Sequence, residues 1–172
     1  TATPYSTRIP SLSTSPQPDP SHLRIAVAAS SWYPEIMQPL IAGAQRAFHE
    51  VLGDDGGRIT VIECPGTWEL PGTITHMCQE LDPKADAFVA LGCVIKGETS
   101  HDRWISGAVC NTLAYLSTSM RVPIALGVLT CDTMAQAEAR AGGEHGNKGY
   151  DAMKAAIEQA VTLRGLSWNR LS

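Results

Sequence analysis

A hydroxyl-rich segment with a histidine follows one of the most apolar runs of this sequence. The run 87–95 ends shortly before Gly97, and Thr99, Ser100 and His101 come next. A glycine here permits a tight turn, and backbone N–H groups opening a helix, together with hydroxyls, can bind a phosphate. Histidine side chains titrate near neutral pH, so His101 can move a proton beside that phosphate. The segment therefore predicts an anion site with an acid–base group. A helix cap followed by a surface histidine is the alternative.

A second pair of candidates flanks the glycine-rich segment GGEHG. Arg140 precedes it and Lys148 follows it. The guanidinium of arginine presents a fork of donors that matches phosphate oxygens, so the pair predicts a phosphate clamp, with a solvated charge pair as the alternative. The sequence holds no GxxxxGK[ST] motif, which indicates a small phosphate ester rather than a nucleoside triphosphate. Glu98, beside the anion site, is expected to point its carboxylate away from the phosphate.

Aromatic residues mark two other segments. Trp32 follows an expected strand and predicts stacking of a planar ligand, with packing on its own helix as the alternative. The free backbone N–H groups of Thr67 and Trp68 can bind the edge of a heterocycle, and the Glu69 carboxylate can accept hydrogen bonds from ligand hydroxyls. For Glu69 the alternative is an acid placed favourably in the first turn of a helix.

The elements that must position these residues alternate along the chain. The expected strands are 23–30, 58–64, 87–95 and 123–130, and the expected helices are 34–53, 66–81, 101–119, 133–142 and 147–165. This order predicts an α/β fold: a three-layer α/β/α domain with a mostly parallel four-stranded sheet, flavodoxin-like in architecture. In such sheets ligands bind beyond the carboxyl ends of the strands, so the loops there should form one site.

The chain divides into a tail and a single domain. Residues 1–22 are rich in Pro, Ser and Thr, and we expect an extended, flexible tail, with a transit-peptide remnant as the alternative. Residues 23–172 are long enough to bury a core as one α/β domain.

Composition excludes several function classes. The net charge of −4 argues against a nucleic-acid-binding protein, and no apolar stretch approaches the ~20 residues that a membrane helix needs. The five cysteines contain no CxxC pair, which predicts reduced thiols in a cytoplasmic protein, with the plastid as a less favoured location. The histidine spacing predicts no metal site.

Four segments together closely resemble the lumazine synthase family. They read SSWYPEI, PGTWELP, ALGCVIKGETSH and PIALGVLT with AEARAGGEHGNKG, and the resemblance runs from about Arg24 to Leu163. It implies a transferase, 6,7-dimethyl-8-ribityllumazine synthase, at the penultimate step of riboflavin biosynthesis. This enzyme condenses 5-amino-6-(D-ribitylamino)uracil with 3,4-dihydroxy-2-butanone 4-phosphate and releases phosphate and water. The resemblance implies no cofactor and no metal.

The resemblance also implies a role for each matching residue. His101 matches the proton-transfer residue. The matches to the ribitylaminouracil site are Trp32, Thr67, Trp68, Glu69, Cys93, Val94, Ile95 and Leu126. The matches to the butanone phosphate site are Glu98, Thr99, Arg140 and Lys148. In this family Arg140, Lys148 and the residue at position 126 come from the neighbouring subunit.

The chain departs from the family pattern at three places. Trp32 replaces the more frequent Phe, a substitution that keeps a stacking face. Leu126 stands where many members have an aromatic residue, which loosens one wall of the ring pocket. Asp102 follows His101 where an aromatic residue is common, so it is a candidate partner of His101 or of Arg103.

The resemblance further implies a homo-oligomer with active sites between subunits. A pentamer is expected, with an icosahedral shell of pentamers as the alternative, and riboflavin synthase is a candidate protein partner. Three rival functions remain: a non-catalytic flavin- or lumazine-binding homologue, an inactive shell protein and a flavodoxin-like electron carrier. The carrier is disfavoured because SSWYPE is too short and aromatic for its phosphate loop.

Overall fold

The four predicted strands form one parallel sheet in the computed structural model, which describes residues 22–168. They are β1 (Leu23–Ser30), β2 (Gly57–Cys64), β3 (Ala87–Ile95) and β4 (Ile124–Cys131). The strand order is β2-β1-β3-β4, which confirms the predicted flavodoxin-like sheet. The predicted tail, 1–22, lies outside the described residues apart from His22.

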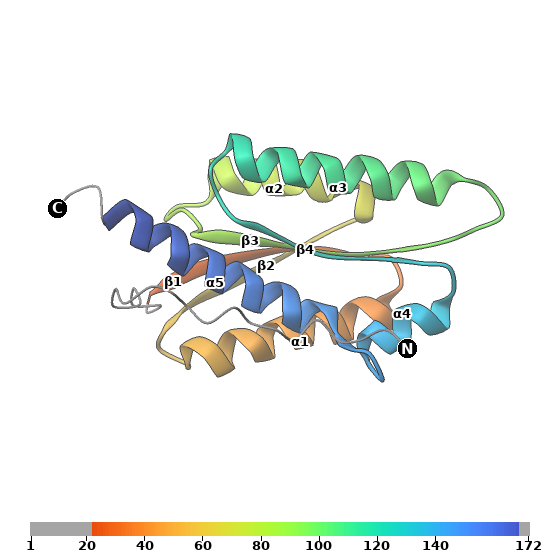
Figure 1. Cartoon of the computed structure of the whole chain (residues 1–172), viewed down its shortest axis with the longest axis horizontal. Coiled ribbons are helices and arrows are strands. Elements are labelled where there is room, and N and C mark those ends of the chain that lie inside the picture. The colour runs from red at the N-terminus through yellow and green to blue at the C-terminus, as the bar shows by residue number, and fades with distance from the viewer. Residues whose placement is uncertain (1–21, 169–172) are drawn as a thin grey trace.

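Helices cover both faces of this sheet (Figure 1). Helices α1 (Pro34–Leu52) and α5 (Lys148–Trp168) pack on one face, and α2 (Leu70–Glu80) and α3 (His101–Ser119) pack on the other. β3 is buried along almost its whole length because it lies between two strands and two helix layers. The three-layer prediction is therefore confirmed. No helix of the described segment is long and apolar enough to cross a membrane.

The predicted ends of α1 are confirmed, and the local sequence explains them. Pro34 lies in the first turn, where its missing N–H costs nothing, and Gly53 ends the helix with φ 70°. Tyr33 takes the left-handed conformation, φ 57°, and its carbonyl accepts from Ile36 N and Met37 N at 2.8 and 2.9 Å. This sharp entry turns the chain from β1 into α1 and places Trp32 at the rim of the sheet.

The predicted helix 66–81 is wrong at its start. A 3₁₀ turn, η1 (Thr67–Glu69), comes first, and the α-helix begins only at Leu70. Pro71 is the reason: it has no N–H for the carbonyl of Thr67, and its ring would clash there in a continuous α-helix. The Leu70 N–H takes that carbonyl instead.

The sequence prediction also missed a small hairpin after α4 (Met134–Arg140). β5 (Ala141–Gly143) pairs antiparallel with β6 (Gly146–Asn147), and α5 follows directly. Gly142 and Gly146 have φ of 120° and 80°, which glycine adopts readily. Strands of two or three residues are too short to show a periodic pattern, so the glycines are what indicates a break between α4 and α5 in the sequence.

Candidate active site

A cavity of about 470 Å³ lies at the carboxyl ends of β1, β2 and β3. The loops after these strands, η1 and the first turn of α3 form its walls. It brings together nine of the predicted site residues: Trp32, Thr67, Trp68, Glu69, Cys93, Val94, Ile95, Thr99 and His101. Their meeting point agrees with the rule that parallel sheets bind ligands at this edge.

Two indole rings give the cavity its aromatic surface. Trp32 is 65% exposed and Trp68 is 58% exposed, although large aromatic side chains are usually covered. The Trp32 ring meets Tyr33 edge-on, with centroids 6.3 Å apart. A Cβ at Gly66 would lie 3.0 Å from a carboxylate oxygen of Glu69 and 3.6 Å from the Trp32 ring. A glycine at this place therefore lets the indole and the carboxylate border the same space.

Thr67 fixes η1 to the end of β3. Its hydroxyl donates to Cys93 O and accepts from Cys93 N, both at 3.2 Å, and the side chain is buried. The β1 ladder ends at Leu91, so this hydroxyl takes the place of a strand partner. A Cβ at Gly92 would lie only 2.8 Å from the same hydroxyl oxygen, which explains a glycine there.

The backbone of Ile95 stays open toward the cavity. Phe88 N and Lys96 N donate toward β4, to Pro123 O and Cys131 O. Because strand residues alternate in direction, the N–H and C=O of Ile95 point the other way, as those of Cys93 do. No β1 residue pairs with β3 beyond Leu91. The N–H of Ile95 can therefore donate to a planar, amide-like ligand, and its C=O can accept from the same ligand.

Replacing Thr67 by Val should destabilise the fold by about 1–3 kcal/mol, because the Cys93 N–H and C=O would lose their partner inside the core. Thr67→Ser keeps the hydroxyl and is the matched control. Urea unfolding of both variants measures the difference. Equal free energies of unfolding for the two would show that this bridge contributes nothing.

His101 opens α3 at the mouth of the cavity. Its backbone N–H donates to the Thr99 hydroxyl at 3.4 Å, and its side chain is exposed. Asp102 also lines the cavity, but no ion pair joins it to His101 or Arg103 within residues 22–168. The imidazole is thus exposed at the mouth of the cavity and is not tied to a carboxylate of the described residues.

The cysteine on the cavity wall is not a nucleophile. Burial raises the pKa of the Cys93 thiol to about 12, with nearby Cys131 and Glu35 adding to the rise. The thiol therefore stays protonated at neutral pH and contributes a neutral surface. As for metals, the described residues contain no cluster of three or more His, Cys, Asp or Glu side chains.

Arg140 and Lys148 line a different cavity, of about 290 Å³, together with His145 and Asp151. Arg140 ends α4, and its Nη1 donates to Gln136 O at 3.0 Å in its own helix. Arg140 also lowers the pKa of the Cys131 thiol, although burial raises that pKa by more. Within one chain, this cationic cavity is separate from the one that His101 lines.

Two further predicted residues also lie off the His101 cavity. Leu126 pairs with Ala90 in the sheet and is 46% exposed on the face that α3 covers only in part. Glu98 is exposed in the loop before α3 and is not part of the cavity wall. One chain therefore presents most of a ligand site and leaves four predicted residues elsewhere: Glu98, Leu126, Arg140 and Lys148.

Sequence reasoning missed several lining residues. Ile105 lies one helical turn after His101, and Asp151 lies one turn after Lys148, so helical spacing would have indicated both. His145 sits in the hairpin that the strand pattern did not reveal. For Gly66, the sequence indicates a place in a turn but gives no indication that it lines the cavity.

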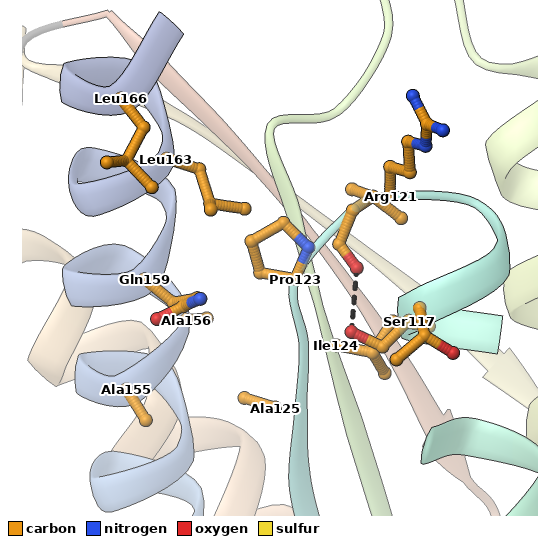
Figure 2. A pocket seen from close by; sticks show the side chains of 12 residues that line it. Ser117, Arg121, Pro123, Ile124, Ala125, Ala155, Ala156, Gln159, Leu163 and Leu166 are labelled. Atoms are coloured by element: carbon orange, nitrogen blue, oxygen red, sulfur yellow. Dashed lines mark hydrogen bonds between the residues drawn. The ribbon is translucent and has the colours of Figure 1, made fainter. Parts of the chain in front are cut away.

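A larger groove, of about 1050 Å³, lies at the amino end of β4 (Figure 2). There Leu163 and Leu166 of α5 face Pro123, and Ser117 donates to the carbonyl of Val122 at 2.9 Å. Its charged residue is Arg121, whose guanidinium points away from these apolar side chains (Figure 2). The groove offers no acid–base pair, so the smaller cavity at the carboxyl ends is the candidate active site.

Comparison with known proteins shows the family of this chain. The sequence model of the 6,7-dimethyl-8-ribityllumazine synthase family matches residues 22–164. A protein of that name from Streptomyces avermitilis is 42% identical over 147 residues, which cover 84% of this chain and 88% of the relative. Those from Kocuria rhizophila and Aquifex aeolicus are 39% and 38% identical over 147 residues, covering 84% of this chain and 90% and 92% of the relatives. The matched region includes both cavities.

Proposed function

Because this chain belongs to the 6,7-dimethyl-8-ribityllumazine synthase family, we propose that it is a transferase that condenses 5-amino-6-(D-ribitylamino)uracil with 3,4-dihydroxy-2-butanone 4-phosphate. The observation that carries the proposal is the meeting of nine predicted residues around one cavity, His101 among them. Phosphate and water leave, and the lumazine is the product. The five free cysteines agree with a reducing, cytoplasmic setting.

The pyrimidine ring stacks on Trp32 in this proposal. Its amide edge binds the open backbone of Ile95, with Cys93 and Val94 in the wall beside it. The ribityl hydroxyls bind the Glu69 carboxylate and the backbone N–H groups of Thr67 and Trp68. The exposure of the Trp32 ring and the unpaired donor and acceptor of Ile95 support this placement. Both features suit a flat, polar-edged ligand.

The butanone phosphate occupies the His101 end of the cavity, next to Thr99 and Glu98. Its phosphate is bound by Arg140 and Lys148 of a neighbouring subunit, and Leu126 of that subunit borders the ring. The two cavities have no lining residue in common within one chain, which supports a site shared between subunits.

The chemistry needs orientation and one proton-transfer group. The pyrimidine amine attacks the ketone to form an imine, phosphate leaves, and the ring closes. His101 moves the protons, and its imidazole has no side-chain ion pair in the described chain to restrain it. Correct placement of the two reactants supplies as much as about 7–11 kcal/mol. The proposed mechanism uses neither a cofactor nor a covalent nucleophile.

A ring-shaped oligomer completes the proposal, with a pentamer expected and an icosahedral shell as the alternative. The exposure of three large apolar side chains on α3 and β4 supports it, since a subunit interface would cover them: Trp104 is 75% exposed, Tyr115 68% and Leu126 46%. Light scattering distinguishes monomer, pentamer and shell.

Incubation with both substrates tests the function. Lumazine absorbance should appear together with an equal amount of inorganic phosphate, and neither should appear when one substrate is left out. Tight binding of a lumazine without turnover would instead support the non-catalytic flavin- or lumazine-binding homologue.

A further inference from the structure

The hairpin between α4 and α5 determines the positions of Arg140 and Lys148. Arg140 is the last residue of α4, Lys148 is the first of α5, and β5 and β6 connect them. In the described part of the chain neither cation forms an ion pair with a carboxylate. Their relative position therefore depends on whatever holds the hairpin in place.

A single side-chain amide joins the two strands of this hairpin and ties them to α1 and α5. Asn147 Nδ2 donates to Pro39 O of α1 at 2.8 Å and to Ala141 O at the start of β5 at 3.2 Å. Its Oδ1 accepts from Tyr150 N in the first turn of α5 at 3.0 Å. The last contact is an ordinary helix N-cap, which Asn or Asp can make. The first two need an N–H donor, which Asp lacks.

Helix α1 has a gap that matches this amide. A Cβ at Gly43 would lie 2.2 Å from Asn147 Oδ1 and 2.4 Å from its Cγ, so any larger residue would displace the side chain. A Cβ at Gly149 would lie 2.0 Å from Leu40 O, so the start of α5 also touches α1 through a glycine. Glycine in a helix interior costs about 1 kcal/mol relative to alanine, and the close approach accounts for Gly43.

From these contacts we infer that Asn147, seated against Gly43 of α1, is a positioning residue that holds Arg140 and Lys148 at the spacing a phosphate monoester needs. The inference rests on the proposed function, since it assigns a support to the phosphate site of that reaction. Asn147 does not touch the phosphate. It acts through the hairpin that carries both cations.

Kinetics of Asn147→Ala and Asn147→Asp test this inference. Both variants should raise the KM for the butanone phosphate about tenfold or more, because a shift of about 1 Å in binding groups has effects of this size. The KM for the pyrimidine should stay within about twofold, since that cavity is separate. Asn147→Asp preserves the N-cap of α5, so a wild-type KM for this variant would reduce Asn147 to a helix cap and overturn the inference.

Gly43→Ala tests the same contact independently, from α1. Its methyl group should displace Asn147 and raise the same KM, although alanine favours the helix. Added to Asn147→Ala, it should change the KM by less than about twofold, because the amide it displaces is already gone. Fully additive effects would contradict the contact.

Failure of the proposed function can be distinguished from failure of the inference about Asn147. If the wild-type chain forms no product, calorimetric binding of inorganic phosphate replaces KM as the readout. Asn147→Asp should then weaken phosphate binding about tenfold. An unchanged affinity, or no phosphate binding by the wild-type chain, would overturn the inference.

Discussion

Replacing His101 by Ala is expected to lower kcat by about 10²-fold or more while leaving measurable turnover. In the proposed mechanism the imidazole at the mouth of the cavity is the acid–base group, and the cavity walls proposed to orient the reactants remain in the variant. Both KM values should change little, because the ring chiefly moves protons. Steady-state kinetics with each substrate varied in turn measure the effect.

His76→Ala is the matched control for that experiment. His76 is exposed on α2 and lies off the walls of both cavities. Its replacement should leave kcat unaltered. If His101→Ala behaved like His76→Ala, the proton-transfer role of His101 would be wrong.

Replacing Arg140 by Ala is expected to raise the KM for the butanone phosphate by about 10–100-fold. A charge-assisted hydrogen bond contributes about 1.5–3 kcal/mol, and the guanidinium fork supplies two to one phosphate. The KM for the pyrimidine should stay near the wild-type value, since Arg140 lies in the other cavity. Arg140→Lys should recover part of the affinity through charge alone.

Arg58→Ala, which removes an exposed cation of β2, controls for the loss of net positive charge. A general electrostatic effect would change the KM of both variants alike. A normal KM for Arg140→Ala would mean that the phosphate binds elsewhere.

The sheet and most of the first cavity could be predicted from the sequence for one physical reason. The run 87–95 is apolar without interruption, and the run 23–30 is apolar apart from Arg24 and Ser30, as expected for buried parallel strands. The loops after these two strands then share an edge of the sheet. The aromatic, hydroxyl and carboxylate residues in those loops could therefore be placed together before any coordinates were available.

Contacts between distant segments could not be predicted in this way. The sequence indicates a role for the Thr67 backbone, yet in the structure the Thr67 hydroxyl bridges the N–H and C=O of Cys93, 26 residues further along the chain. Asn147 drew no attention, because its partner Pro39 is 108 residues away and Gly43 looks like an ordinary helix defect. Neither pairing leaves a local pattern, since each arises from how β3 and α1 come to lie beside other elements.

The separation of the two cavities could likewise not be predicted from the pattern of residues in the sequence. The sheet rule predicts one site from all the loops, but the segment after β4 places Arg140 and Lys148 on a cavity of their own. Only the family resemblance indicated that a neighbouring subunit supplies these cations. The proposed oligomer thus explains why a single chain shows two incomplete sites.

Co-assembly of His101→Ala and Arg140→Ala chains tests the shared site most directly. In a ring, a site that combines the intact His101 of one subunit with the intact Arg140 of the next forms only in mixed oligomers. Equal mixing should restore normal sites to about a quarter of the positions, as expected for head-to-tail contacts in a closed ring. The kcat/KM of the mixture for the butanone phosphate should therefore rise to about a quarter of the wild-type value. A mixture no more active than the average of the two variants would contradict the shared site.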